Sequence, residues 1–165
     1  MHWVFSLIIQ NKETYRSLYE TQNNHNQEVT MNKEKLIKQI QKHEGLRLKP
    51  YKCSANKYTI GYGRNLEDNG ISQAEANMML ANDIHKCIEQ VETLHCFDKL
   101  NDTRQNVLIN MCFNLGFYGL KKFKKFLRAL ELEDYETASI EMLDSLWSKQ
   151  VGIRALELSD QIRLG

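Results

Sequence analysis

The chain has 165 residues, of which 42% are hydrophobic and 26% are charged, a balance typical of a globular protein rather than a disordered one. This length is enough for one domain with its own core, or for a small lobe and a larger one. The formal net charge is only +1 at pH 7, so nucleic-acid binding, which needs strong and clustered positive charge, is not expected. One proline and eight glycines favour a helical protein with few sharp turns.

Residues 1–30 differ from the rest of the chain. Trp3 to Ile9 is apolar, but the run is short for a membrane span, no Lys or Arg precedes it, and no small-residue cleavage site follows. The next residues are rich in Asn and Gln, as in flexible segments. We therefore expect 1–30 to be a leader or flexible extension, with Met31 as the start of the domain and no stable membrane insertion. An export or tethering signal is the alternative, and the missing flanks disfavour it.

The cysteines and histidines do not form a recognisable metal site. The four cysteines show no CxxC pair and no zinc-type spacing; they are Cys53, Cys87, Cys96 and Cys112. Three of them lie in helix-like runs, where a free Cys behaves as a small buried hydrophobe. A disulfide framework is compatible with the even count, but a chain of this length does not need one. His85 and His95 lack a third ligand in register. We expect reduced, mostly buried thiols and no metal.

From Asn32 onward the apolar pattern becomes regular. Leu36, Ile37 and Ile40 fall at helical spacing in a Lys-rich segment, which predicts a short amphipathic helix ending at Gly45. Residues 48–53 and 57–61 contain aromatic and β-branched residues on either side of Ser-Ala-Asn, which predicts a hairpin, and residues 64–66 predict a third strand.

The remainder of the chain predicts helices. Ser72 and Glu75 form a capping box that opens a linking helix over about residues 73–96. Residues 104–115 are apolar on almost all sides, which predicts a buried central helix. Three further amphipathic helices are expected over 120–130, 135–147 and 154–163. The predicted fold is α+β and mainly helical. A small lobe with a β-hairpin sheet (about 44–72) is joined by the linking helix to a helical bundle lobe (about 97–165), and the first helix is assigned to that bundle.

A carboxylic acid, a thiol and a hydroxyl fall within sixteen positions of this small lobe. Glu44, Cys53 and Thr59 are separated by eight and then five residues, a length that can turn back and aim all three side chains into one cleft. Glu44 stands in the last turn of its helix, where the helix dipole disfavours a carboxylate. The dipole, together with partial desolvation, favours the protonated form that a general acid needs. A solvated Glu at a helix end is the commoner outcome for the position alone.

The run HEGLRLKPYKCSANKYTIGYGR (43–64) resembles the active-site segment of phage T4-type lysozymes, glycoside hydrolase family 24. The family pattern is a Glu, eight residues, usually an Asp, five residues, and a Thr inside a Thr-Ile-Gly-x-Gly strand. Glu44 and Thr59 match this pattern, and Cys53 stands where most members carry Asp. The likeness continues in LINMCFNLG (108–116), in Trp147, and in Gln150 with Arg154, and it covers about 130 of the 165 residues.

The resemblance implies a lysozyme-like fold and a muramidase. Such an enzyme hydrolyses the β-1,4 bond between N-acetylmuramic acid and N-acetylglucosamine in peptidoglycan, as phage endolysins do. Glu44 would protonate the glycosidic oxygen, Thr59 would hold the attacking water, and Arg154 would pair with the acid. No cofactor is implied. The expected partner is the peptidoglycan glycan strand, and the expected state is a monomer that waits in the host cytoplasm until lysis and then acts at the wall.

The resemblance also implies substrate contacts. Phe113 falls at a sugar-contacting position and matches the family, and Asn114 replaces a Gln near the scissile bond while keeping an amide. Asn65, Phe126 and Glu141 fall at other such positions and differ from the family. The outer subsites are therefore expected to differ as well.

The role of Cys53 can be interpreted in several ways. A thiol has an ordinary pKa of ~8.5, so only a few per cent is thiolate at neutral pH without assistance. A thiolate would activate water and give inversion, or attack the anomeric carbon and give retention. A neutral thiol would do neither well. We favour a working Cys53 because the rest of the motif is intact. The alternatives are a lytic transglycosylase that uses Glu44 alone and a wall-binding module without catalysis.

Four lysines form a basic cluster, Lys121, Lys122, Lys124 and Lys125. Peptidoglycan and its attached polymers are anionic, so this cluster is suited to hold the wall electrostatically. A solvated helix face is an equally good interpretation.

Overall fold

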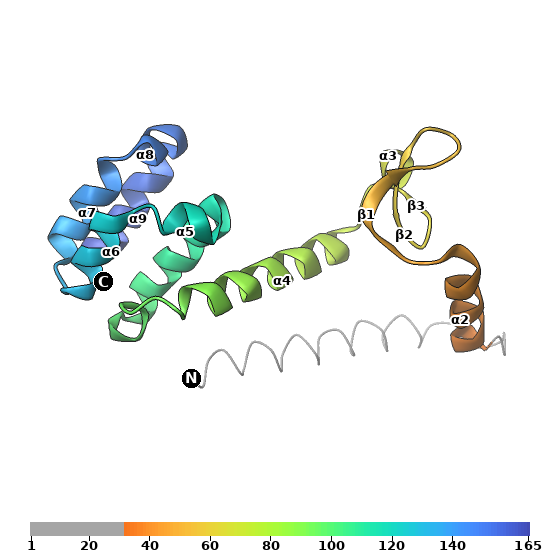
Figure 1. The fold of residues 1–165 in the computed structure, drawn as a ribbon, viewed down its shortest axis with the longest axis horizontal. Coiled ribbons are helices and arrows are strands. Elements are labelled where there is room, and N and C mark those ends of the chain that lie inside the picture. Colours follow the sequence, from red (N-terminus) through yellow and green to blue (C-terminus); the bar gives the residue numbers. More distant parts are fainter. Residues whose placement is uncertain (1–31) are drawn as a thin grey trace. The chain divides into compact units, whose positions relative to one another are not determined.

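The computed structural model describes residues 32–165, so the predictions for residues 1–30 lie outside the described part. The chain forms two compact units, one up to Gly70 and one from Ile71 to Gly165. Each is described by itself, with its elements labelled in Figure 1. No helix of residues 32–165 has both the length and the apolar character needed to cross a membrane.

The first unit contains a helix, a small sheet and a short second helix. Its elements are α2 (Lys33–Glu44), β1 (Arg47–Lys52), β2 (Tyr58–Gly61), β3 (Arg64–Asn65) and α3 (Leu66–Asn69). The sheet is antiparallel in the order β1-β2-β3, with Tyr51 opposite Thr59. Gly45 ends α2 with φ +67° and donates its N–H to the Gln41 carbonyl. The predicted hairpin, third strand and helix end are therefore confirmed.

Short helix α3 was not predicted. Asn65 creates it, because the Asn65 side chain accepts hydrogen bonds from the N–H groups of Glu67 and Asp68. Helix α2 contains no buried residue, and Leu36, Ile37 and Ile40 are all exposed. Its assignment to the helical bundle stays a prediction.

The second unit is helical throughout. Its elements are α4 (Gln73–Val91), the 3₁₀ helix η1 (Phe97–Lys99), α5 (Asp102–Leu120), α6 (Lys124–Glu131), α7 (Tyr135–Leu143), α8 (Leu146–Val151) and α9 (Ile153–Leu164). The capping box of Ser72 and Glu75 is present at the start of α4.

Three helix boundaries differ from the prediction, and one is the start of α6, which lies at Lys124 instead of residue 120. Helix α4 ends at Val91 instead of near residue 96, because Thr93 donates both its N–H and its hydroxyl to the Gln90 carbonyl and turns the chain there. The helix expected over 135–147 is two helices, α7 and α8. Ser145 separates them because its hydroxyl accepts the Ser148 N–H and caps α8.

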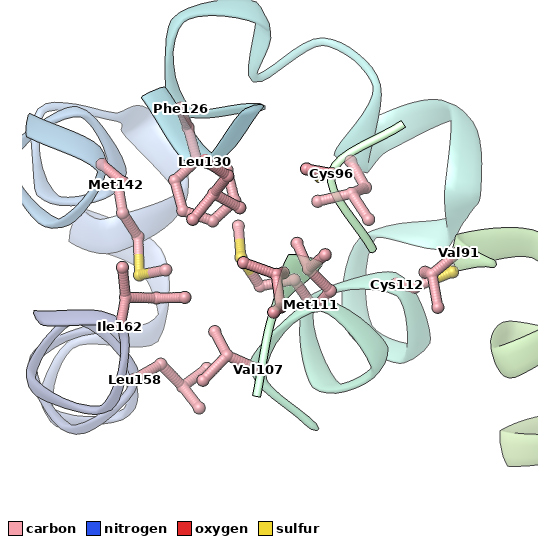
Figure 2. Packing of buried hydrophobic residues seen from close by; sticks show 14 of the residues in the cluster. Val91, Cys96, Val107, Met111, Cys112, Phe126, Leu130, Met142, Leu158 and Ile162 are labelled. Carbon is pink, nitrogen blue, oxygen red and sulfur yellow. The ribbon is translucent and has the colours of Figure 1, made fainter. Parts of the chain in front are cut away.

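The core of the second unit surrounds α5. Val107, Leu108 and Met111 have no exposed surface, which confirms the predicted buried central helix. In Figure 2, Val107 lies beside Leu158 of α9, with Leu130 of α6 and Met142 of α7 on the same side of α5, whereas Cys112 lies next to Val91 of α4 on the opposite side. Helix α5 breaks at Gly116, which has φ +69°. The regular part of the helix thus ends where the sequence predicted, after Leu115.

Candidate active site

The β1–β2 turn places the Cys53 thiol among hydrogen-bond donors. Cys53 follows β1, its N–H bonds the Lys57 carbonyl at 3.0 Å, and Asn56 closes the turn with φ +60°. Hydrogen bonds from the backbone of Lys57, then of Ala55, and from the Thr59 side chain lower the pKa of Cys53. These donors stabilise the thiolate, so the local fold favours the reactive form of the thiol.

Thr59 is the buried polar residue of this hairpin, with 4% of its surface exposed. Its hydroxyl donates to the Lys57 carbonyl at 3.2 Å, and the same hydroxyl contacts Cys53. A hydroxyl carries one proton and two acceptor lone pairs. It can therefore accept from a neutral Cys53 while bonded to the carbonyl, and turn to donate once Cys53 is ionised.

The neighbouring lysine is neutralised by a carboxylate. Lys57 Nζ donates to Asp68 Oδ1 at 2.5 Å, and this pair is the main reason that the pKa of Lys57 is raised. Asp68 thus neutralises the Lys57 ammonium group. The pKa of Cys53 is lowered by the hydrogen bonds of the hairpin and not by the charge of this lysine. The first unit thus brings the Cys53 and Thr59 side chains together, and their catalytic roles stay predictions.

Glu44 is the last residue of α2 and is exposed. A Cβ added to Gly63 would lie 3.4 Å from Glu44 Oε2, so the carboxylate faces the turn between β2 and β3. Gly63 has φ +86°, a conformation that side chains rarely adopt. Within the first unit Glu44 is therefore open to solvent, and its carboxylate lies beside the Thr-Ile-Gly-Tyr-Gly turn.

Asn65 has a structural task that the sequence prediction did not include. Its Oδ1 accepts from the N–H groups of Glu67 and Asp68 at 3.0 and 3.1 Å, and its Nδ2 donates to Asp68 Oδ2 at 2.9 Å. One amide hydrogen is left for a ligand. The predicted substrate contact of Asn65 stays a prediction.

In the second unit, Arg154 of α9 is held by α5. Its Nε and Nη2 donate to Asn110 Oδ1 at 3.0 and 2.5 Å, and Nη2 lies 3.5 Å from the Asn110 carbonyl oxygen. Asn110 is neutral, so it orients the guanidinium without neutralising the charge. The predicted pairing of Arg154 with Glu44 joins the two units and stays a prediction.

Asn114 lies one turn further along α5. Its Oδ1 accepts from Trp147 Nε1 at 2.7 Å, so the acceptor end of the amide is engaged and the NH₂ end is left as a donor. Trp147 is 4% exposed and packs edge-on against Phe123, so its predicted place in the core is confirmed. Phe113, beside Asn114, is 44% exposed, and this aromatic face is accessible to a ligand.

The two other family positions named from the sequence have structural roles. Phe126 is 1% exposed and belongs to the core. Glu141 lies 3.6 Å from Lys125 Nζ. All four cysteines are free thiols; Cys87, Cys96 and Cys112 are buried and Cys53 is partly exposed.

Two positioning residues were missed in the sequence, Asn110 and Gly63. A signal for Asn110 was present: Asn110 and Asn114 are two amides four residues apart in an otherwise apolar helix, so they share one side of it. The signal for Gly63 was the second glycine of Gly-Tyr-Gly, which points to a backbone conformation or a close approach that a side chain would prevent.

Comparison with known proteins agrees with the family resemblance of the motif residues. The model of the phage lysozyme family matches residues 41–160. An endolysin of Acyrthosiphon pisum secondary endosymbiont phage 1 is 32% identical over 120 residues, which cover 70% of this chain and 79% of that protein. Probable T4-type lysozyme 2 of Dictyostelium discoideum is 28% identical over 142 residues, covering 68% of this chain and 84% of that protein. The pre-baseplate central spike protein Gp5 of Enterobacteria phage T4 is 27% identical, and 28% of its length is matched.

Proposed function

Because the chain belongs to the phage lysozyme family and is a wall hydrolase of the lysozyme type, we propose that it is a muramidase. It hydrolyses the β-1,4 bond between N-acetylmuramic acid and N-acetylglucosamine in peptidoglycan. The observation that carries this proposal is the Cys53 thiol, held at the motif position by hydrogen bonds that lower its pKa, beside the buried Thr59.

Glu44 is the general acid of the proposed reaction. As the bond between the anomeric carbon and the glycosidic oxygen breaks, the Glu44 proton passes to that oxygen, and the sugar acquires oxocarbenium character. The carboxylate that forms at Glu44 is stabilised by the Arg154 cation, which Asn110 orients through its side-chain oxygen. Gly63 leaves the space beside Oε2 open, which gives the glycosidic oxygen access.

Cys53 has two chemically complete roles. As a base, its thiolate takes a proton from water held by Thr59, while the water oxygen bonds the anomeric carbon with inversion. As a nucleophile, the thiolate sulfur bonds the anomeric carbon, and water then displaces it with Glu44 as base, giving retention. NMR of the first-formed anomer separates the two roles.

The substrate contacts assigned to the second unit follow from its exposed groups. The face of Phe113 packs against a sugar ring, and the Asn114 NH₂ group donates to a sugar oxygen or an acetamido carbonyl. Asn65 contributes its remaining amide hydrogen from the first unit. Each of these contacts leaves the residue's own structural hydrogen bonds in place.

Turbidity loss of purified peptidoglycan tests the assignment with four proteins: wild type, Glu44→Gln, Cys53→Ser and Cys53→Asp. We expect wild type to clear the suspension, Glu44→Gln to lose at least about 100-fold in rate because general acid catalysis is removed, and Cys53→Ser to be strongly impaired. Cys53→Asp is the matched control, since a carboxylate is charged at neutral pH and can take either role.

Product masses and the variants decide between the alternatives. Reducing ends indicate hydrolysis, whereas anhydro-muramic ends indicate a lytic transglycosylase. Full activity in Cys53→Ser would remove Cys53 from the mechanism. Sedimentation of wild type with peptidoglycan and no release of soluble fragments would leave a wall-binding module.

We further propose that this activity serves host cell lysis, with the enzyme held in the cytoplasm until a partner pore opens the membrane. Expression in the host should then cause little lysis until the inner membrane is permeabilised. Immediate lysis without permeabilisation would argue for export by another route.

A further inference from the structure

A surface cavity of about 220 Å³ lies in the second unit and is lined by none of the residues assigned to catalysis. It is bordered by the turn after α4, by the end of α5 and by α6. Its walls combine apolar and polar side chains, among them His95, Phe117, Lys121, Leu127 and Glu131. A cavity of this size holds one small group, and the mixed walls suit a group with both a charge and some carbon surface.

The cavity wall carries one lysine and one glutamate, and two further basic side chains bond the glutamate. Lys121 Nζ lies 5.4 Å from the centre of the Phe117 ring. The carboxylate of Glu131 is paired with Arg128 Nη1 at 2.9 Å, and its backbone carbonyl accepts from Lys99 Nζ at 3.1 Å. Arg128 therefore offsets the negative charge of Glu131, and Lys99 adds a second nearby cation.

Lys124 extends the positive charge along α6. Lys124, Leu127 and Glu131 are spaced by three and four residues, so they share one side of the helix, and two of them line the cavity. Lys125 is one position further round and pairs with Glu141 of α7 at 3.6 Å. Within residues 32–165, Lys121 and Lys124 form no ion pair with a carboxylate, so their charge is available to a partner.

The kind of cation indicates the kind of anion. Carboxylates are best recognised by the planar fork of Arg, whereas Lys acts as a point charge that suits phosphate. Arg128 is already paired with Glu131, and the cavity wall itself offers Lys121, with His95 as an additional donor. Phe117 and Leu127 supply apolar surface for the carbon chain that carries the phosphate.

We propose that this cavity, with Lys121 and Lys124, is a second wall-contact site that binds polymers of phosphate-linked polyols attached to peptidoglycan. One phosphate lies between Lys121 and His95, its polyol carbons pack on Phe117, and Lys124 contacts the next phosphate of the repeat. This inference rests on the proposed action at the wall but needs no cleavage. It assigns two lysines of the basic cluster, Lys121 and Lys124, to a contact that holds the enzyme on its substrate.

The test measures binding to purified bacterial walls that carry such polymers, before and after hydrofluoric acid removes the phosphate polymers and leaves the glycan and its peptides. Glu44→Gln serves as the parent protein so that the wall stays intact. Lys121→Gln/Lys124→Gln is compared with Lys125→Gln/Lys149→Gln, a control with the same change in charge at exposed positions. Thermal unfolding of each variant establishes that it is folded.

We expect the parent and the control to bind untreated walls at least roughly tenfold more tightly than stripped walls, with an affinity that falls as salt is added. Lys121→Gln/Lys124→Gln should bind both walls equally and weakly. Equal binding of the parent to both walls, an equal loss in the control, or a preference for phosphatidylglycerol vesicles over untreated walls would each overturn the proposal. The wild-type enzyme distinguishes failure of this binding site from failure of the proposed function. If the muramidase assignment is wrong, neither wall is cleaved. If only the binding site is wrong, both walls are cleaved and are bound with equal affinity.

Discussion

Gly63→Ala probes the contact between Glu44, the proposed general acid, and the β2–β3 turn. The added methyl would lie 3.4 Å from Glu44 Oε2, and the backbone has φ +86° there. Strain from a side chain at such a φ costs about 1–3 kcal/mol of folding free energy. The methyl also fills the space beside Oε2, while a general acid must come within about 2.6–3.2 Å of the oxygen that it protonates.

Two separate effects are therefore expected from Gly63→Ala. The free energy of unfolding should fall by about 1–3 kcal/mol, and kcat/KM on peptidoglycan should fall at least about tenfold, which corresponds to about 1.4 kcal/mol of transition-state stabilisation. Urea unfolding measures the first effect and turbidity loss the second, at a temperature where circular dichroism shows the variant to be folded.

Gly70→Ala is the matched control for this experiment. Gly70 also has a positive φ, +56°, but an added Cβ would meet nothing within 4 Å. It should lose stability to a similar degree and keep its activity. If the folded Gly63→Ala enzyme is as active as Gly70→Ala, then the space beside Glu44 Oε2 is not used in catalysis, and the reasoning is refuted.

Three further predictions follow from the described contacts. Because hydrogen bonds lower the pKa of Cys53, its alkylation rate should rise through a midpoint below the ordinary ~8.5, and Thr59→Val should move that midpoint to higher pH. The lowered pKa also stabilises the fold above the unfolded thiol's pKa, and this contribution is lost as the pH falls through the folded value. Asn110→Leu removes the hydrogen bonds that orient Arg154, so urea unfolding should show a loss of about 1.5–3 kcal/mol, with reduced kcat in the turbidity assay. Leu108→Ala, at a side chain with no exposed surface, should cost about 2–5 kcal/mol.

Each of these predictions has an outcome that contradicts it. An unchanged alkylation profile in Thr59→Val would show that the hydroxyl does not assist the thiolate. Full kcat in Asn110→Leu would mean that Arg154 does not depend on α5 for its position. For the core, Leu146→Ala is the control, because this leucine is 77% exposed and should change stability by less than about 0.5 kcal/mol; equal losses at both leucines would contradict the buried position of α5.

Local sequence signals were sufficient for most of the fold. The apolar stretch of α5, the capping box at Ser72 and the glycine after Glu44 each act within a few residues, and the structure has each element where its signal lies. The errors occurred where a side chain bonds the backbone against the helical pattern. Thr93 ends α4 early, and Ser145 divides the helix predicted over 135–147. Hydrophobic periodicity does not reveal either of these side-chain hydrogen bonds.

The candidate site was predictable in its residue types but not in its contacts. The spacing of Glu44, Cys53 and Thr59 indicated acid, thiol and hydroxyl chemistry, and the hairpin joins the last two. That Arg154 is oriented by Asn110, 44 residues away, depends on how α5 and α9 pack. Long-range contacts of this kind are determined by the whole fold and leave only a weak trace in the sequence, here an amide in an apolar helix.

Under the proposed function, a thiol at position 53 makes a demand on the hairpin that a carboxylate would not make. A carboxylate at this position is ionised throughout the neutral range, whereas a thiol with an ordinary pKa of ~8.5 is mostly protonated there. The backbone donors of the turn and the Thr59 hydroxyl around Cys53 act in the direction needed, because each stabilises the charged form. Backbone N–H groups of the turn cannot be removed by substitution without changing its shape, which leaves Thr59 as the side chain through which the ionisation of Cys53 is adjusted. If Cys53 and Thr59 act as proposed, a single hydroxyl both holds the attacking water and favours the charged form of the thiol.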